Sequence, residues 1–271
     1  MSILTEHVRF EDHVGTLAWP ERAQLPLPGV VVIPEVWGVD GHIEDVTRRI
    51  AAAGYAALAP DIYAPGGVRP EALSLARIAE MQGFMGSLPR NAWMDEQARG
   101  LALQAQGPEK AARIGETMGM LWGGMGRRSA EFVETLRAGV RYLRTSAPQS
   151  QGQKVASVGF CMGGALSALL ACEEPAVSGA VVFYGSSPAL ELVPHVACPV
   201  LGLYAGLDER INGGVPAFAQ AMKGAGKSFE FHTYEGASHG FFNDGRESYH
   251  VRAARDAFVR TLDFFQRQLA S

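Results

Sequence analysis

Cysteine is scarce in this chain of 271 residues, with only three, at positions 161, 172 and 198. Their number is odd and no two have C-x-x-C spacing, which excludes a disulfide framework and the usual zinc sites. The seven histidines likewise show neither H-x-x-x-H nor H-E-x-x-H spacing. We therefore expect no metal, no organic cofactor and at least one free thiol.

Long runs of one residue type are also missing. The formal net charge is −4 and no Lys/Arg run is present, which argues against nucleic acid or an anionic membrane surface as the main partner. No apolar run reaches membrane-spanning length, and residues 1–10 lack the apolar stretch of a secretory signal. These absences predict a cytoplasmic protein with a small-molecule partner, while its oligomeric state is left open.

Short apolar runs bounded by Gly and Pro predict six buried strands. They cover 29–34, 55–60, 154–159, 179–184, 200–205 and 229–234. Helical patterns lie between most of them, at 43–53, 129–144, 164–172, 215–224 and 248–269. This alternation predicts a single α/β domain over 1–271, with a mostly parallel central sheet and helices on both faces. The segment 10–19 is expected as an antiparallel contribution at the sheet edge.

The stretch 66–128 interrupts this alternation, because it contains no convincing strand and six of the nine methionines. Helical patterns at about 70–82 and 92–103 make it a helical insertion. One interpretation is a cap over the active site, in which flexible Met side chains line an adaptable apolar pocket. The other is a helical excursion that packs on the sheet or on another subunit.

The clearest local motif runs Gly159-Phe160-Cys161-Met162-Gly163-Gly164, after a predicted strand and before a predicted helix. A sharp strand-to-helix turn needs small residues around an exposed nucleophile, and the three glycines supply them. The positive end of the following helix favours the thiolate of Cys161. The alternative makes Cys161 a small buried apolar residue in a turn that only packs strand on helix.

An acid and a base follow in the order that α/β-hydrolases use. Asp208 comes just after the strand predicted at 200–205, and His239 follows the strand predicted at 229–234. His239 is expected to take the thiol proton while Asp208 orients its ring. Glu209 is the alternative acid. The other histidines lie within predicted strands or helices or precede the nucleophile or the acid.

Together these motifs resemble the dienelactone hydrolase family. The match includes 34–38 (PEVWG), 54–55 with 60–63 (GY and PDIY), the Cys161 turn, 183–185 (FYG) and the loops of Asp208 and His239. The resemblance implies an α/β-hydrolase fold and hydrolysis of a lactone or small carboxylic ester by a Cys-His-Asp triad, through a thioester acyl-enzyme.

The resemblance also assigns roles outside the triad. It implies that Glu35 pairs with the thiol of Cys161 and helps to activate it when substrate arrives; alternatively, Glu35 caps the helix that begins near Ile43. The backbone N–H groups of Met162 and Val36 are expected to form the oxyanion hole. Substrate contacts are expected from Trp37, Tyr63 and Phe241.

One departure from the family pattern concerns the substrate. Members of the family hold a substrate carboxylate with arginines, and Asn243 stands where one of these is expected after His239. Candidate replacements in or near the insertion are Arg69, Arg77, Arg90, Arg127 and Arg128.

Two alternative functions remain: a general carboxylesterase for apolar esters, and a non-catalytic ligand-binding protein on the same scaffold. A redox role for Cys161 lacks an obvious resolving cysteine.

Overall fold

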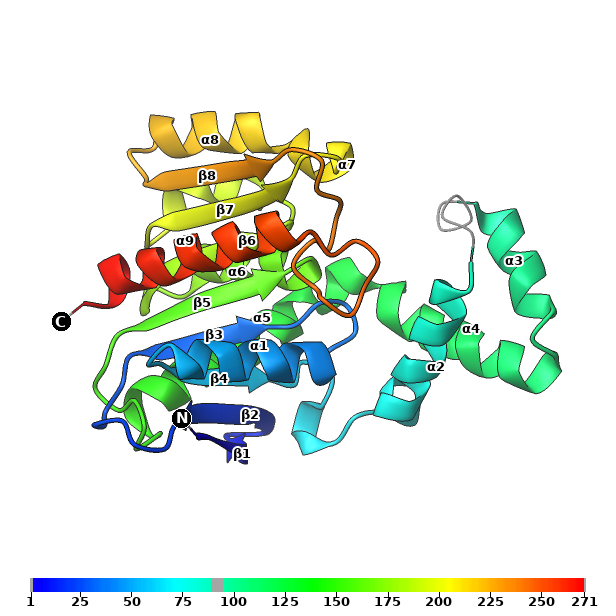
Figure 1. The fold of residues 1–271 in the computed structure, drawn as a ribbon, viewed down its shortest axis with the longest axis horizontal. Coiled ribbons are helices and arrows are strands. Elements are labelled where there is room, and N and C mark those ends of the chain that lie inside the picture. The colour runs from blue at the N-terminus through cyan, green and yellow to red at the C-terminus, as the bar shows by residue number, and fades with distance from the viewer. Residues whose placement is uncertain (1, 89–94, 271) are drawn as a thin grey trace. The chain divides into compact units, whose positions relative to one another are not determined.

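The computed structural model describes residues 2–88 and 95–270 (Figure 1). The chain divides into two compact units. The first combines Met1–Ile62 with Glu131–Ser271, and the second is Tyr63–Ala130. All strands of the described chain belong to the first unit.

The first unit is built on an eight-stranded sheet of order β1-β2-β4-β3-β5-β6-β7-β8. The strands are β1 Ile3–Phe10, β2 His13–Pro20, β3 Gly29–Ile33, β4 Ala56–Pro60, β5 Val155–Phe160, β6 Val177–Phe183, β7 Val200–Ala205 and β8 Phe229–Tyr234. The six strands from β3 to β8 are parallel, while β1 pairs antiparallel with β2 and β2 antiparallel with β4. The predicted mostly parallel sheet is confirmed.

Helices cover both faces of this sheet, which explains the continuous apolar runs of its central strands. Every residue of β3, β4, β5 and β7 is buried. Figure 1 shows α1 (Gly41–Ala52) and α9 (Val251–Leu269) in front of the sheet and α6 (Met162–Glu173) behind it. The remaining helices that contribute to this unit are α5 Met125–Thr145, α7 Glu209–Asn212, α8 Val215–Gly224 and the 3₁₀ helix η4 Leu190–His195.

The second unit is helical in the residues described. It contains η1 Pro65–Gly67, η2 Glu71–Leu73, α2 Leu75–Gly86, α3 Glu96–Gln104 and α4 Pro108–Trp122. Arg77 of α2 donates to Thr117 (3.2 Å) and Glu116 (2.8 Å) of α4, and Thr117 donates to the carbonyl of Ala72 (2.8 Å). The predicted insertion falls within this unit, and its role as a cap stays a prediction.

Several element boundaries differ from those predicted. The pattern at 10–19 identified only β2 and the turn before it, because β1 alternates weakly and is largely exposed. The helix α4 was not predicted, and α2 begins five residues later than expected, after the cap of Ser74. Residues 92–94 of the other predicted helix lie outside the described part of the chain.

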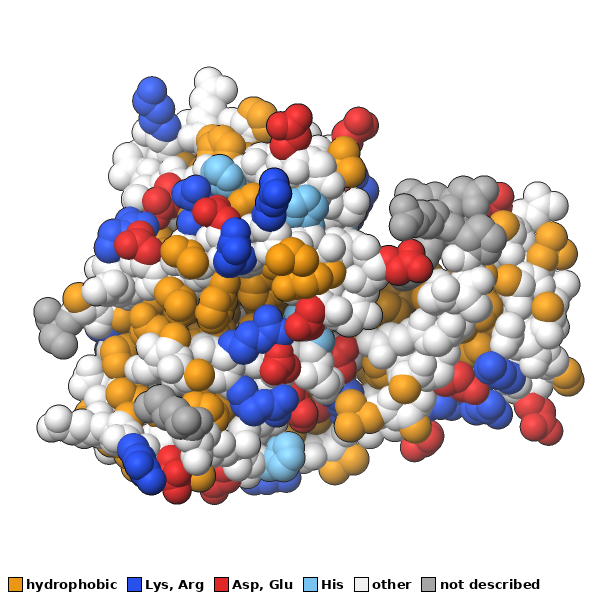
Figure 2. All heavy atoms as spheres, viewed as in Figure 1, with side chains coloured by type: hydrophobic (Ala, Val, Ile, Leu, Met, Phe, Trp, Pro, Cys, Tyr) orange, Lys and Arg blue, Asp and Glu red, His pale blue; other side chains and the backbone are white. Residues whose placement is uncertain are grey.

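Charged side chains of both signs are interspersed on the face shown in Figure 2, with apolar side chains between them. Among the described helices, none combines the length and the apolar character needed to cross a membrane.

Candidate active site

A sharp turn between β5 and α6 carries Cys161. Its φ of +56° lies in the left-handed region, which residues other than glycine rarely adopt. A Cβ on Gly159 would lie 1.8 Å from the carbonyl oxygen of Gly163, and a Cβ on Gly163 would lie 2.4 Å from that of Ile33. Glycine at both positions therefore lets the turn close, and it places Cys161 half-buried at the positive end of α6.

His239 and Asp208 meet at the carboxyl ends of β8 and β7. The Nδ1 atom of His239 lies 2.5 Å from Oδ2 of Asp208. The second carboxylate oxygen of Asp208 accepts from the backbone N–H of Ile211 at 3.4 Å, so Asp208 also caps α7. Because an ionised carboxylate only accepts, Nδ1 of His239 carries the proton and Nε2 is left for another partner. Asp208, and not the alternative Glu209, is thus the acid that contacts the histidine.

The ionisation of His239 is tuned by its neighbours. Burial lowers its pKa, but the hydrogen-bonding acceptors Asp208 and Cys161, with the negative charges of both, outweigh that effect and raise the pKa to about 10. For Asp208, burial acts to raise the pKa, and the hydrogen bond from His239 with its charge brings it below the usual 3.8. The three side chains therefore form one coupled set, in which the imidazole holds a proton readily.

The two expected oxyanion donors lie on segments that touch. Met162 is the first residue of α6, so its N–H belongs to the donors that no carbonyl of the helix satisfies. Val36 lies three residues beyond β3, and a Cβ on Gly163 of α6 would lie 2.4 Å from the carbonyl oxygens of Ile33 and Pro34, just before Val36. Their role as oxyanion donors stays a prediction.

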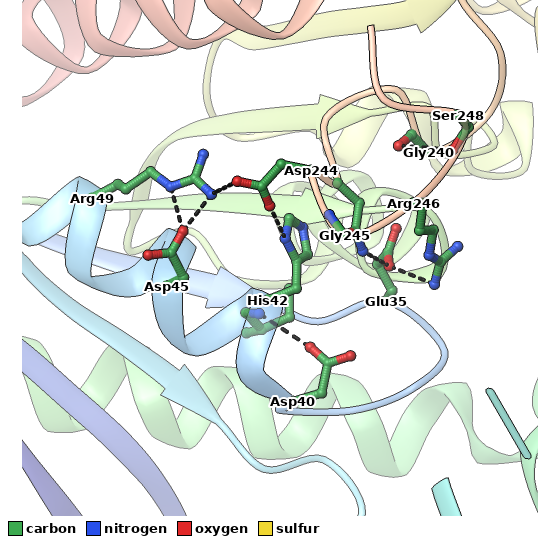
Figure 3. A network of polar contacts seen from close by, with 12 residues as sticks. Glu35, Asp40, His42, Asp45, Arg49, Gly240, Asp244, Gly245, Arg246 and Ser248 are labelled. Carbon is green, nitrogen blue, oxygen red and sulfur yellow. Dashed lines mark hydrogen bonds and ion pairs between the residues drawn. The ribbon is translucent and has the colours of Figure 1, made fainter. Parts of the chain in front are cut away.

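Glu35 is buried beside the loop that follows His239, as Figure 3 shows. Its Oε2 atom accepts from Asn243 Nδ2 at 3.1 Å and lies 3.0 Å from a guanidinium nitrogen of Arg246. Asn243 is itself buried and accepts from the N–H of Gly245 at 3.1 Å. Asn243, which stands where the family pattern has an arginine, thus binds the carboxylate of Glu35. The cation that pairs with Glu35 is Arg246, three residues further along the chain.

The same loop is anchored to α1. Asp244 lies 2.9 Å from Arg49, which also binds Asp45, and 3.7 Å from Nδ1 of the buried His42 (Figure 3). Asp40 caps α1 by accepting from the N–H of Ile43 at 3.1 Å. The helix cap is therefore Asp40, and Glu35 faces the His239 loop instead.

The three expected substrate contacts lie in different surroundings. The ring of Trp37 is buried under the guanidinium of Arg246, at 5.7 Å. Phe241 has no exposed surface and packs on Tyr184 at 5.3 Å between ring centroids. Tyr63 is the first residue of the second unit. All three assignments stay predictions.

Comparison with known proteins identifies the family of the chain. The family model described as "Dienelactone hydrolase family" matches residues 14–269. The chain belongs to the dienelactone hydrolase family. A "Putative carboxymethylenebutenolidase" of Saccharolobus solfataricus is 35% identical over 93% of this chain and 92% of that protein. One of the same name from Methylorubrum extorquens is 30% identical over 89% and 72%. A crystal structure titled "Putative Dienelactone Hydrolase", from Klebsiella pneumoniae, is 26% identical with a TM-score of 0.70, covering 98% of this chain and 100% of that one.

As a dienelactone hydrolase family member, the chain is a hydrolase acting on lactones or esters. The sequence did not predict the ion pair of Arg246 with Glu35, because no pattern after His239 indicates which residue of the loop lies against Glu35. Of the arginines proposed instead, Arg69, Arg77, Arg127 and Arg128 belong to the second unit, and Arg90 lies outside the described residues. Within residues 2–88 and 95–270, no cluster of His, Cys, Asp and Glu has the makings of a metal site.

Proposed function

We propose that this chain hydrolyses a lactone or small carboxylic ester with Cys161 as nucleophile, His239 as general base and acid, and Asp208 as the group that orients His239. The observation that supports it best is the Asp208–His239 contact of 2.5 Å. Cys161 stands on a strained turn, and its thiol contributes to the raised pKa of the same histidine. Position, order along the chain and geometry of the three residues fit the triad of an α/β-hydrolase.

The first half of the reaction forms a thioester. His239 takes the proton of the Cys161 thiol, and the thiolate attacks the carbonyl carbon of the ester. The negative charge that develops on the carbonyl oxygen is met by the N–H groups of Met162 and Val36. When the tetrahedral intermediate collapses, the C–O bond breaks and His239 gives its proton to the leaving alkoxide, which in a lactone stays attached to the acyl chain.

The second half of the reaction regenerates the thiol. His239 takes a proton from a water molecule, and the resulting hydroxide attacks the thioester carbonyl. The C–S bond then breaks, the carboxylic acid leaves, and the proton returns to the sulfur of Cys161. Asp208 keeps the imidazole in one tautomer and stabilises its positive charge in both halves.

Arg246 supports an anionic substrate for this site. Its guanidinium is a third exposed and holds a buried Glu35 carboxylate. A substrate carboxylate that binds the guanidinium would compete with Glu35, and a released Glu35 is then able to turn toward the Cys161 thiol. On this proposal, Arg246 takes the place of the arginine that is absent at Asn243.

The test compares turnover of a dienelactone, which carries a carboxylate, with that of a short neutral aryl ester. Cys161→Ala should lower turnover of both by about a thousandfold or more, because it removes the nucleophile. The matched control is Cys172→Ala, which alters a buried cysteine of the same helix. We expect the control to keep wild-type turnover.

Each outcome decides a separate point. Full activity of Cys161→Ala, or no hydrolysis of either compound by the wild type, would overturn the triad. A wild-type preference for the dienelactone supports recognition of an anion through Arg246, whereas a preference for the neutral ester argues for a general carboxylesterase.

A further inference from the structure

Tyr184 follows β6 directly, at the carboxyl end of the strand that neighbours β5. Its side chain has no exposed surface, and its φ of +40° is one that residues other than glycine avoid. The backbone N–H donates to the carbonyl of Leu203 at 2.9 Å, which holds this conformation. The ring lies 5.0 Å from that of His239, at an angle of 60°. A strained backbone thus directs a tyrosine at the proposed base.

Two buried polar atoms near this ring lack a hydrogen bond of normal geometry within the described residues. They are the hydroxyl of Tyr184 and Oε1 of Glu35. Buried polar atoms are nearly always hydrogen-bonded, so each exception in a native protein calls for an explanation. The other oxygen of Glu35 is already held by Arg246 and Asn243.

The backbone places this tyrosine beside Cys161, because the N–H of Cys161 donates to the carbonyl of Phe183, the preceding residue, at 3.0 Å. Burial raises the pKa of Tyr184 well above its usual 10; the charges of Glu35 and Cys161 and the contact of the hydroxyl with the Glu35 carboxylate raise it further, while Arg246 opposes them. The hydroxyl therefore keeps its proton throughout the working range and acts as a donor toward either anion. His239 faces the same ring, and Asp208 stands behind His239.

We propose that the Tyr184 hydroxyl is a positioning donor that stabilises the Cys161 thiolate beside the carboxylate of Glu35. The inference rests on the proposed function, because it concerns the thiol of the same triad. Two negative groups at one site oppose each other's ionisation. A neutral donor that faces both lowers this cost without adding charge, and hydrogen bonds to charged groups are the strong ones. The tyrosine proton is never transferred in this role.

The experiment measures the rate at which iodoacetamide alkylates the thiol between pH 5 and 9, in the wild type and in Tyr184→Phe. The thiols of Cys172 and Cys198 stay protonated over this range, because burial raises the pKa of Cys172 to about 11 and that of Cys198 to about 12. Alkylation is therefore assigned to Cys161, the half-buried cysteine. Removing the hydroxyl should move the alkylation midpoint up by about one pH unit, so that alkylation below the midpoint is about tenfold slower.

Two further readouts separate this role from a structural one. The kcat for an ester substrate should fall with KM unchanged, and the thermal midpoint should stay the same or rise, since an unsatisfied buried hydroxyl has been removed. The control is Tyr204→Phe, which removes the hydroxyl of a tyrosine buried to the same degree in β7. That variant should keep the wild-type alkylation profile.

Superimposed alkylation profiles for Tyr184→Phe and the wild type would overturn the inference. So would a clear loss of thermal stability or of the fold, because it would make the hydroxyl a structural group. The alkylation assay needs no turnover, so its result is independent of whether the ester test supports or overturns the proposed hydrolysis.

Discussion

At the scale of single residues, the candidate site depends on a few buried charges whose partners come from distant parts of the chain. Glu35 lies on the loop after β3, and its partners Asn243 and Arg246 lie on the loop after β8. A carboxylate taken out of water needs such partners, since an unpaired buried charge is costly. The pair therefore joins the two loops as well as placing a cation near the triad.

Removing that cation should cost stability. Arg246→Gln removes the cationic partner of the buried Glu35 carboxylate and leaves neutral donors such as Asn243. We expect the free energy of unfolding to fall by about 1–3 kcal/mol. The measurement is urea unfolding at neutral pH. Adding Glu35→Gln to this variant should restore part of the loss, because the unpaired charge is then gone.

An exposed arginine provides the comparison for that experiment. Arg267 of α9 pairs with Glu230 at 2.6 Å and with Asp263 at 3.1 Å, all three about half exposed or more. Arg267→Gln should change the free energy of unfolding by no more than about 0.5 kcal/mol. Equal losses in Arg246→Gln and Arg267→Gln would contradict the importance given to burial of Glu35.

At the scale of elements, the position of Cys161 follows from how closely the start of α6 approaches the ends of β3 and β6. Gly164 would place a Cβ 2.7 Å from the carbonyl oxygen of Phe183, and Gly185 would place one 2.4 Å from the N atom of Ala165. The start of α6 is therefore packed against the ends of both β3 and β6 with no room for a methyl group. This packing fixes the positive end of the helix behind the thiol.

Filling that contact should destabilise the protein. In Gly163→Ala the new methyl group would lie 2.4 Å from the backbone oxygens of Ile33 and Pro34. Backbone atoms cannot move aside as the end of a flexible side chain can. We expect a loss of about 1–3 kcal/mol in the free energy of unfolding. The control is Gly41→Ala at the start of α1, where no atom lies within 4 Å and the change should stay within about 0.5 kcal/mol. A Gly163→Ala variant as stable as this control would disprove the tight contact.

The same elements explain what could be predicted from the sequence. Continuous apolar runs and glycines at sharp turns are local signals, so the central strands and the Cys161 turn could be located without a structure. The roles of Arg246 and Tyr184 were missed, because the first depends on the path of a loop and the second on which side chains meet at the ends of different strands. The helix α4 was missed for a similar reason: it is amphipathic against α2, and this packing partner is visible only in three dimensions.

At the scale of the whole molecule, His42 and His239 make the stability of the fold depend on pH in opposite directions. Burial lowers the pKa of His42 from 6.5, despite the nearby charges of Glu35 and Asp40. The contribution of neutral His42 to the free energy of unfolding is therefore present above pH 6.5 and is lost as the pH falls through the lowered pKa. The pKa of His239 is raised to about 10, so its contribution is complete below 6.5 and is lost as the pH rises toward 10.

These opposite dependences predict that the urea midpoint of the wild type is highest near about pH 6.5 and falls on both sides. His239→Gln should flatten the alkaline fall and leave the acid side as it is. His42→Phe should do the reverse, since a phenyl ring suits the neighbouring rings of Phe160 and Phe242 and takes up no proton. A urea midpoint of the wild type that keeps rising from pH 6.5 to 10 would mean that the pKa of His239 is not raised on folding. The imidazole would then not hold the positive charge that the proposed attack by the Cys161 thiolate requires.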